Sequence, residues 1–337
     1  MKSIFIATIP LFFLFTSLTK VAAQDEINDF LNSSVADGEK LVGAYIDPLM
    51  KGLSLGMNQG WYNTAKPHKL LGFDLTLTAN LMYVPDEDLL FDPASLGLTQ
   101  IQLVDPVTGN PISGSIPTFF GKDTPPTFSP NVTPGIPFDD FEGPGGVDLE
   151  DEIGSNFVPV PIVQLGFGLP KGTDVKFRFV PSVEVGDGDF KLYGVGIMHD
   201  IKQYMPGIKK LPFDLSLFAG YTHLELDVAF DAANPDQRGE FEVNSTNFQA
   251  IISKKIAVLT LYGGMGYNIA KSNLAVKGTY DFTFDGQVTD PVDLSFGASG
   301  FRGTAGLRLK FAVFTLHADY TVQKYNALSV GFGINVR

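Results

Sequence analysis

The chain has 337 residues, no cysteine and a formal net charge of −13 at pH 7. The negative charge argues against nucleic acid as a partner, and the lack of cysteine excludes disulfide frameworks, thiolate metal sites and lipidation at Cys. Charged residues make up 18% of the chain, below the roughly 25% of soluble domains. The 29 Phe and 36 Gly favour many strands joined by tight turns.

Residues 1–23 are predicted to be a signal peptide. Lys2 gives a positive start, an apolar run extends from Ile4 to Leu18, and Val21-Ala22-Ala23 provides compact residues for cleavage. The alternative is a buried N-terminal helix. We expect export and cleavage near Ala23-Gln24. After Leu18 no run of about 18 apolar residues recurs, so we expect no membrane-spanning helix.

Residues 24–69 are predicted to form a short helix and a luminal or periplasmic segment. The helix is expected from Asp37 to Lys51, weakened by Pro48, because four apolar residues recur at helical spacing: Leu41, Ala44, Tyr45 and Leu49. It either enters a barrel from below as a plug or packs underneath the barrel. The segment from Leu53 to Tyr62 is expected in the lumen or along the rim, since another crossing would place the mature N-terminus outside the cell.

Strict alternation of apolar with polar or small residues begins at Leu70 and continues to Val84. The same pattern recurs at residues 175–183, 213–222, 301–311, 314–320 and 328–336. A strand of a soluble protein usually has about five or six residues. These runs are longer, and they are long enough to cross a bilayer at a tilt. Residues 70–337 are therefore predicted to form an all-β, antiparallel transmembrane β-barrel of about ten strands, or twelve if two doubtful segments join the wall.

The lengths of the connections predict the orientation, because such barrels have short periplasmic turns and long outer loops. The predicted periplasmic connections are Leu169 to Thr173, the turn near Lys254-Lys255, the turn at Lys310-Phe311, and the linker from Asp200 to Lys210. The predicted outer excursions are Pro85 to Asn156, Asp231 to Gly239, and Ala270 to Ser295. Three candidate strands lie between two periplasmic turns, Val258 to Ile269, Leu274 to Phe284 and Phe296 to Leu309. Because the number of crossings must be even, the middle strand is expected to project outside.

The segment from Pro85 to Asn156 is the predicted outer loop. It holds eleven Pro, and thirteen Asp or Glu against the single Lys122. Proline cannot donate ladder hydrogen bonds and carboxylates are costly in hydrocarbon, so this segment is not wall. Residues 98–104 and 116–121 are expected to be its ordered part, folded over the barrel mouth. A calcium site is one hypothesis for its carboxylates and a solvated charge run is the other, since the spacing matches no EF-hand; the candidate ligands are Asp139, Asp140, Glu142, Asp148, Glu150, Asp151 and Glu152. No other cofactor is expected.

Polar residues on the inward face are predicted to line the lumen, because the outward face is apolar. They are Asp74, Asn80, Gln164, Lys176, Arg178, Glu184, Asp214, Gln249, Arg302, Arg308, His317 and Asp319. One interpretation is a narrow lumen filled by salt bridges; the other is a polar pathway that selects a solute by charge and width. We expect no enzyme: among the four histidines only His317 faces inward near Ser329 and Asp319, and no G-x-S-x-G elbow is present.

Four stretches resemble an uncharacterised family of outer-membrane proteins from Bacteroidota: residues 61–69 (WYNTAKPHK), 117–121 (PTFFG), 198–202 (MHDIK) and 302–306 (RGTAG). The resemblance covers most of the mature chain and implies no established activity. A luminal N-terminal segment before a barrel is also distantly similar to the long-chain fatty acid transporter family, whose ligand site has no residue-by-residue match here.

These observations predict a cell outer-membrane barrel that contacts lipid and acts as a small channel or transporter for a modest solute, a hydrophobic solute being one option. The alternative is a non-enzymatic structural or interaction protein whose acidic loop binds a partner or Ca²⁺. No oligomeric state is predicted.

Overall fold

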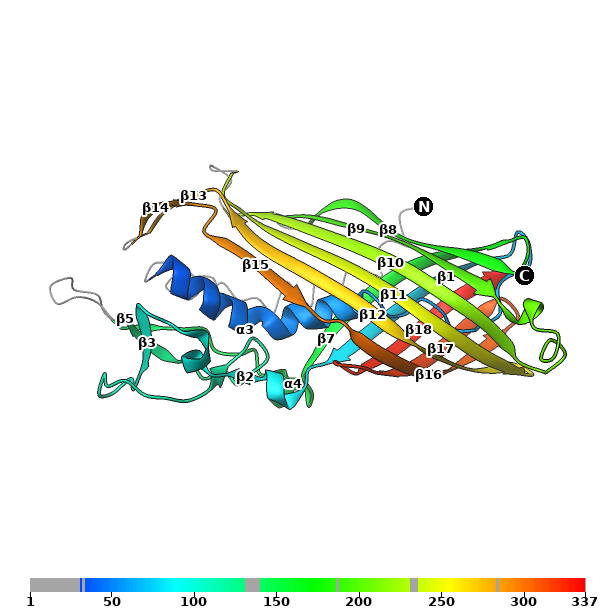
Figure 1. The fold of residues 1–337 in the computed structure, drawn as a ribbon, viewed down its shortest axis with the longest axis horizontal. Coiled ribbons are helices and arrows are strands. Elements are labelled where there is room, and N and C mark those ends of the chain that lie inside the picture. The colour runs from blue at the N-terminus through cyan, green and yellow to red at the C-terminus, as the bar shows by residue number, and fades with distance from the viewer. Residues whose placement is uncertain are drawn as a thin grey trace.

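Ten antiparallel strands close into a barrel (Figure 1). The computed structural model describes Leu31 and residues 34–130, 140–185, 188–230, 236–282 and 285–336. In ring order the strands are β1 (Phe73–Tyr83), β7 (Phe157–Leu169), β8 (Thr173–Val185), β9 (Gly188–Asp200), β10 (Asp214–Ala229), β11 (Arg238–Ile256), β12 (Leu259–Lys277), β16 (Gly300–Phe311), β17 (Phe314–Val322) and β18 (Ala327–Val336). Pairing of β1 with both β7 and β18, and of β11 with β12, completes the ring. The prediction of an antiparallel barrel of ten to twelve strands is confirmed, while the predicted signal peptide lies outside the described residues.

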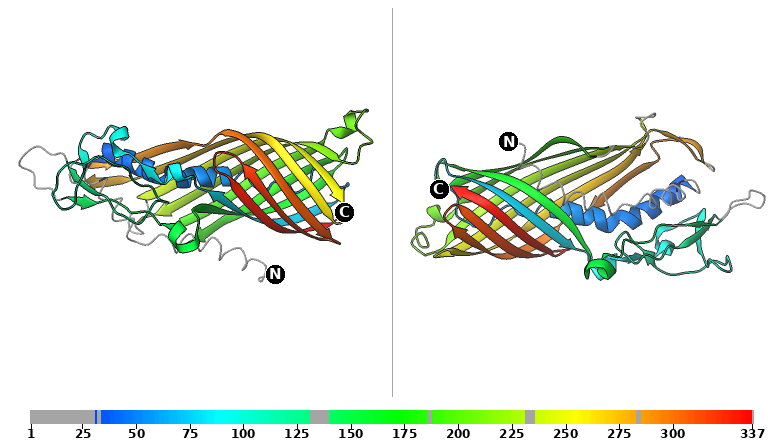
Figure 2. Two further views of the ribbon diagram at one scale, coloured as in Figure 1. Left: turned by 90° about the horizontal axis from the view of Figure 1, so that it is seen from below. Right: turned by 180° about the vertical axis from the view of Figure 1, so that it is seen from behind.

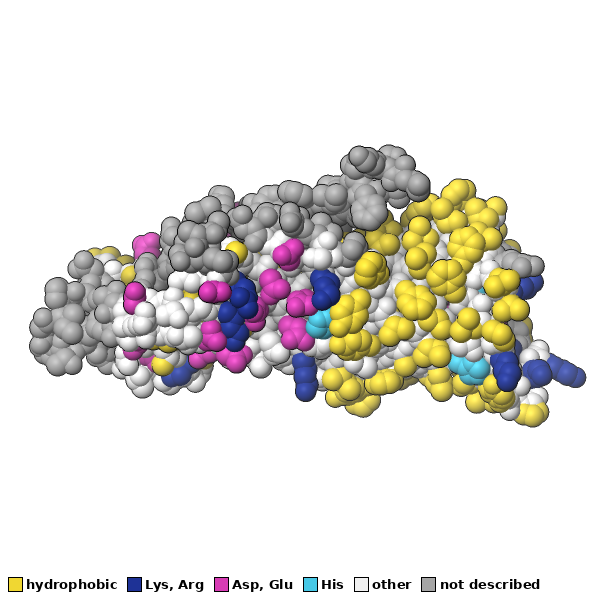
Figure 3. Space-filling view, turned by 90° about the horizontal axis from the view of Figure 1, so that it is seen from above, with side chains coloured by type: hydrophobic (Ala, Val, Ile, Leu, Met, Phe, Trp, Pro, Cys, Tyr) yellow, Lys and Arg dark blue, Asp and Glu magenta, His cyan; other side chains and the backbone are white. Residues whose placement is uncertain are grey.

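The period of two residues decides which side chains face the lumen. In β1, Phe73, Leu75 and Leu77 are exposed on the outside, and the residues between them are buried inside. The other strands repeat this pattern, so apolar side chains cover the barrel half of the molecule (Figure 3). An apolar surface of this extent requires a non-aqueous neighbour.

The two ends of the barrel differ in their connections. One end, here the short-turn end, carries the β7–β8, β11–β12 and β16–β17 turns, the 201–213 connection and the end of β18. Lys171, Ala257 and Ala312 have positive φ in these turns, as tight hairpins require. The other end, here the long-connection end, carries residues 84–156 and 278–299. The predicted grouping of short and long connections is confirmed, with two turns falling two or three residues after the predicted positions.

Helix α3 (Val35–Gly56) is longer than the predicted helix and lies at the long-connection end. Ser34 caps it by accepting a hydrogen bond from the Asp37 N–H. Its first turn touches residues beyond the barrel, where the Val35 N–H donates to Asp285. Its last turns lie inside the barrel mouth, against Val158 and Val160 of β7. Packing on this wall outweighs the loss of one helical hydrogen bond at Pro48.

Residues 57–69, here the luminal segment, continue from α3 through the barrel to the short-turn end, where β1 begins (Figures 1 and 2). The helix therefore enters from the long-connection end, and the predicted entry from the short-turn end is wrong. The parity argument counted only strands in the wall, whereas this segment crosses the barrel inside it. Residues 53–62, for which the lumen and the rim were both expected, form the end of α3 and a loop in the lumen.

Strand β12 extends beyond the ring and supports a short annex. Its outer part pairs with β15 (Val292–Gly297), while β13 (Thr279–Phe282) pairs with β14 (Gly286–Thr289). The predicted strand at 274–284 does project outside, but its first residues continue β12 without a break. The predicted strand at 296–309 is divided at Ala298 into β15 and β16.

The outer loop (residues 85–156) folds against the first half of α3. Its elements are η2 (Asp86–Asp88), β2 (Leu90–Phe91), η3 (Pro93–Leu96), β3 (Ile101–Val104), β4 (Ile116–Pro117), β5 (Thr127–Pro130), β6 (Phe141–Glu142) and α4 (Leu149–Ile153). Ile101, Ile116 and Phe128 form a buried cluster with Leu41 and Val42 of α3. The predicted ordered parts of the loop are confirmed, and they pack on the helix at the barrel mouth.

No helix among the described residues is both long and apolar enough to cross a membrane.

Candidate functional site in the barrel lumen

The half of the lumen nearer the long-connection end, here the outer half, is apolar and holds the end of α3. Leu55 and Met57 belong to a buried cluster with apolar wall residues from seven strands: Met82, Val158, Val160, Ile162, Leu192, Leu224, Val243, Ala270 and Ala327. Gly52 and Gly56 allow the helix to touch the wall, since a Cβ at either would lie 2.4 Å from a methyl group of Val158 or Val160. Ser54 adds a polar contact, with its Oγ 3.0 Å from the Oγ of Ser272.

Two arginines from different parts of the wall bind the chain where α3 ends. Arg178 of β8 donates to the carbonyl oxygens of Met57 (2.6 Å) and Gln59. Arg302 of β16 donates to the Asn58 carbonyl (2.9 Å) and to the Gln59 side-chain oxygen (2.7 Å). Both guanidinium groups are buried, and neither forms an ion pair among the described residues. Hydrogen bonds from charged donors are strong and directional, and the C-terminal end of a helix attracts positive charge. Arg178 and Arg302 with these bonds are here called the arginine latch.

A layer of aromatic rings lies immediately below the latch. The Trp61 ring is stacked under the Arg178 guanidinium, 3.5 Å from ring centroid to Cζ, and contacts Phe218 of β10. Gln164 donates to the Trp61 carbonyl (3.1 Å). Tyr62 donates to Gln249 (2.6 Å), so the segment is bonded to the wall on both sides.

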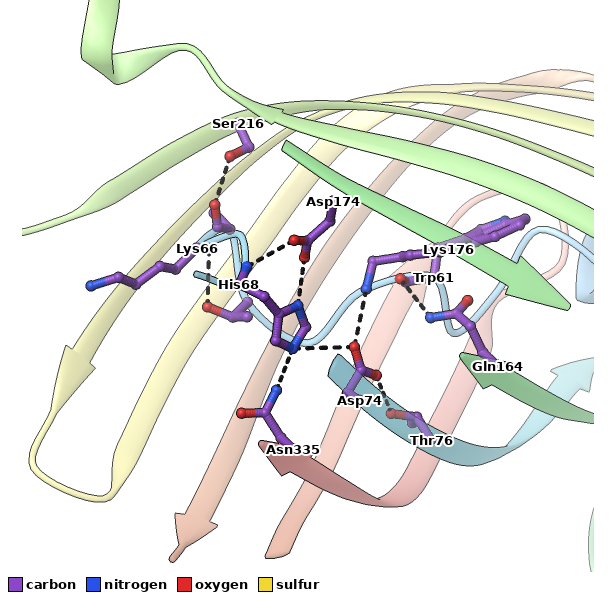
Figure 4. A network of polar contacts seen from close by, with 12 residues as sticks. Trp61, Lys66, His68, Asp74, Thr76, Gln164, Asp174, Lys176, Ser216 and Asn335 are labelled. Atoms are coloured by element: carbon purple, nitrogen blue, oxygen red, sulfur yellow. Dashed lines mark hydrogen bonds and ion pairs between the residues drawn. The ribbon is translucent and has the colours of Figure 1, made fainter. Parts of the chain in front are cut away.

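A clasp around His68 closes the short-turn end of the lumen (Figure 4). The His68 backbone N–H donates to Asp174 (2.8 Å), and its ring Nδ1 lies 2.8 Å from the same carboxylate. The other ring nitrogen, Nε2, lies 2.6 Å from the Asn335 amide nitrogen and 3.3 Å from Asp74. The clasp therefore joins the luminal segment to β8, β18 and β1.

The wall is shaped to accommodate this segment. At Gly196 and Gly220 a Cβ would lie 2.8–2.9 Å from the Trp61 ring, and at Gly264 it would lie 2.2 Å from the Tyr62 hydroxyl. Small inward residues at these points leave room for the aromatic rings of the luminal segment. The lumen is consequently filled by the chain's own N-terminal part.

The structure places most of the predicted lumen residues inside the barrel. Asp214 is half-buried, and the side chain of Glu184 lies outside the described residues. The other ten are buried: Asp74, Asn80, Gln164, Lys176, Arg178, Gln249, Arg302, Arg308, His317 and Asp319. The interpretation of a lumen filled by salt bridges applies to Lys176 and Asp74, whose Nζ and Oδ1 atoms are 3.9 Å apart. It does not describe Arg178 and Arg302, which bind the luminal segment.

The residues considered for hydrolysis are not joined in a relay in the described structure. His317 Nε2 lies 3.5 Å from the Thr78 hydroxyl, and Asp319 accepts a hydrogen bond from Tyr262 (2.7 Å). No hydrogen bond joins His317 to Ser329 among the described residues.

The calcium hypothesis receives no geometric support from the described residues, where no three His, Asp or Glu side chains form a metal-binding group. Asp139 lies outside the described residues, and Glu150 and Asp151 lie on the short helix α4. The calcium site stays an untested prediction.

A family model described as "Family of unknown function (DUF6588)" matches residues 1–336. The chain belongs to this family. No curated protein matches the sequence. The family description does not mention Bacteroidota or fatty acid transporters, so that part of the predicted resemblance is not shown.

Several solved structures align with this chain at very low sequence identity and low TM-scores. The attachment invasion locus protein Ail of Yersinia pestis is 8% identical, with 79% of this chain and 98% of that chain covered and a TM-score of 0.27. The toluene transporter TodX of Pseudomonas putida is 9% identical, with 88% and 76% covered and a TM-score of 0.25. The toluene transporter TbuX of Ralstonia pickettii is 9% identical, with 84% and 75% covered and a TM-score of 0.23.

Sequence reasoning missed Trp61, Gln59, His68 and Phe218 as parts of the site. The only tryptophan of the chain lies in the quoted stretch 61–69, and its rarity was the available signal. On the luminal segment, the acceptors of the arginines are backbone carbonyls except for the Gln59 side chain, and backbone carbonyls have no signature in a sequence.

Proposed function

We propose that this protein is an outer-membrane barrel that transports a small solute and is gated by its own N-terminal segment. The short-turn end faces the periplasm and the long-connection end faces outside, as in other barrels of this kind. The observation that carries the proposal is the lumen filled by residues 50–69, which are held by noncovalent contacts and are not part of the wall.

The lining of the lumen supports a solute with an apolar body and a polar, electron-rich head. With α3 withdrawn, an apolar vestibule would open above Arg178 and Arg302. Those guanidinium groups would then lose their carbonyl acceptors and need a replacement. A carboxylate or carbonyl group on the solute would meet that need, and its apolar part would take the place of Leu55 and Met57.

Reversible disulfides test the gate, because the chain has no cysteine of its own. The pair Ser54→Cys with Ser272→Cys would lock α3 to β12, where the two hydroxyl oxygens are 3.0 Å apart. The pair Thr64→Cys with Ser253→Cys would lock the luminal segment to β11, where they are 3.3 Å apart. We expect ion conductance in planar bilayers, and uptake of dodecanoate into liposomes, in the reduced variants and their loss in the oxidised ones.

The comparison of oxidised and reduced proteins distinguishes a gated transporter from an ungated one and from a barrel that does not transport. Equal passage through oxidised and reduced proteins would mean that the segment is not a gate. No passage in any state, with the wild-type chain as a control, would reject transport altogether.

The second candidate is an interaction protein whose outer loop binds a partner outside the cell. One observation favours it: the loop packs in order on α3 through Ile101, Ile116 and Phe128, so it presents a defined surface. Cells displaying the chain with and without residues 85–156 would differ in partner binding but not in conductance.

A further inference from the structure

A groove of about 800 Å³ lies on the outward face of β9 to β12 and β16. Ala219 and Ala250 form its floor, because each is a small residue in a row of large outward residues. Phe248, Met265 and Phe301 stand beside it, and Met265 and Phe301 are 77% and 83% exposed. The wall is thus indented where the outward surface is otherwise covered by projecting apolar side chains.

The groove leads to a basic patch at the short-turn end. His199 lines the groove, and its ring stacks on Tyr204 of the 201–213 connection, which contains Lys202, Lys209 and Lys210 but no acidic residue. On β11, Ile252 and Lys254 follow Ala250 on the same outward face. Lys254 is four residues from Ala250, or about 14 Å along the strand.

Lys202 donates to the carbonyls of Leu211 and Phe213, but the other lysines of this patch have no described partner that explains their clustering. Lys209, Lys210, Lys254 and Lys255 are exposed, and none forms an ion pair with another described residue. Dark blue side chains gather at this end in Figure 3, whereas the acidic side chains of that face lie beyond the apolar band. The arrangement matches a molecule with an apolar chain and a negatively charged head.

We propose that the groove binds an acyl chain of an anionic phospholipid whose headgroup is held by four exposed lysines: Lys209, Lys210, Lys254 and Lys255. The inference rests on the membrane placement proposed above, with this end at the periplasmic leaflet. Charge complementarity selects this occupant: a second copy of the chain would bring its own lysines against the patch, and a zwitterionic lipid would leave them unneutralised.

The test compares lipids bound by the full chain after reconstitution with equal amounts of phosphatidylglycerol and phosphatidylethanolamine. The protein is extracted in mild detergent, and native mass spectrometry counts the retained lipids. We expect phosphatidylglycerol to be retained several-fold over phosphatidylethanolamine. The double variant Lys254→Gln with Lys255→Gln should abolish the preference, and Ala250→Phe, which fills the groove, should reduce retention of both lipids.

Matched controls come from β1, on the opposite side of the ring, and from the residues before it. Ala79→Phe changes an outward alanine of β1, and Lys69→Gln changes an exposed lysine at the end of the luminal segment, four residues before β1. Both variants should bind lipid like the wild type. Equal retention of the two lipids, equal effects of these controls, or a dimer that buries the groove would overturn the proposal. Failure of the chain to enter liposomes at all would instead refute the membrane placement, and flotation distinguishes that result.

Discussion

The two halves of the lumen hold the same N-terminal segment by different chemistry. In the outer half, α3 packs its apolar side on a ring of Val, Leu and Ile side chains. In the inner half, residues 57–69 are bonded through Arg178, Arg302, Gln164 and the His68 clasp. Apolar packing has no preferred direction, whereas charged hydrogen bonds fix position and register. The inner half therefore determines where the segment stops, and the outer half provides a surface from which a helix can withdraw.

The largest expected effect follows from removing the arginine latch. Arg178→Met combined with Arg302→Met would leave the carbonyl and side-chain oxygens of Gln59 buried without a described donor. The carbonyls of Met57 and Asn58 would keep only their hydrogen bonds from Thr222 and Asn247. We expect a loss of about 3–5 kcal/mol in unfolding free energy, since each unsatisfied buried group costs about 1–3 kcal/mol. The measurements are the temperature of the heat-induced shift in gel mobility and the conductance in bilayers, which should rise.

Arg308→Met is the matched control for the latch, because Arg308 is also a buried wall arginine but has no described hydrogen bond to the luminal segment. It should leave the lumen closed. If Arg308→Met changes the conductance and the unfolding temperature as much as the double variant does, Arg178 and Arg302 have no specific role in holding the segment. The proposed difference between the two halves of the lumen would then be wrong.

A smaller effect is expected from overpacking the outer half. Gly56→Leu would place side-chain atoms against Val160, where a Cβ already comes within 2.4 Å of a methyl group. We expect a loss of about 1–3 kcal/mol and partial withdrawal of α3, because inserting carbons into a close-packed contact costs this much. Protease sensitivity of α3 in detergent reports the withdrawal.

Gly286→Leu is its control, since that position lies in the annex with open space around it, although its positive φ adds some local strain. If α3 of the Gly56→Leu variant resists protease as well as α3 of the wild type, the contact between α3 and Val160 is loose and does not hold the helix in place.

The alternation of apolar and polar residues predicted the barrel because the period of a strand is two residues, whatever its partners. Asp74, Arg178 and Arg302 could be assigned to the lumen on that basis alone. Their partners on the luminal segment could not, since Arg178 binds there to backbone carbonyls more than a hundred residues away in sequence. The alternation could not predict the direction of α3 either, because a segment that passes through the lumen adds no strand to the count of crossings.

The attachment of the outer loop to α3 should depend on pH. Burial alone would raise the pKa of the Asp37 carboxyl, but the backbone N–H groups of residues 99–101 and the Lys40 ammonium together lower it below its ordinary value of 3.8. Because the pKa is depressed in the folded chain, this stabilisation is complete above pH 3.8 and is lost as the pH falls below it. Pepsin digestion, with each rate divided by the rate of cleavage of an unfolded substrate at the same pH, should release the loop faster at pH 2 than at pH 4.

Asp37→Ala should remove this pH dependence and weaken the attachment by about 1.5–3 kcal/mol, the range for a hydrogen bond to a charged group. Asp105→Ala is the control, since Asp105 is exposed and bonds only within its own turn. A pH dependence that persists in the Asp37→Ala variant would assign the effect to other carboxylates.

The smallest effect on the barrel is expected from cutting the outer loop. We predict that protease added to intact cells cleaves within residues 124–156 and leaves the heat-modifiable barrel intact, because the loop rests on α3 and contributes no strand to the ring. Ten strands remain paired after such a cut, so the unfolding temperature should shift by less than that of the Gly56→Leu variant. Calcium should slow cleavage if Asp140, Glu142 and their neighbours bind it, and should have no effect if they are simply solvated. Cleavage only after the outer membrane is opened would invert the proposed orientation, and with it the assignment of the apolar half of the lumen to the outside.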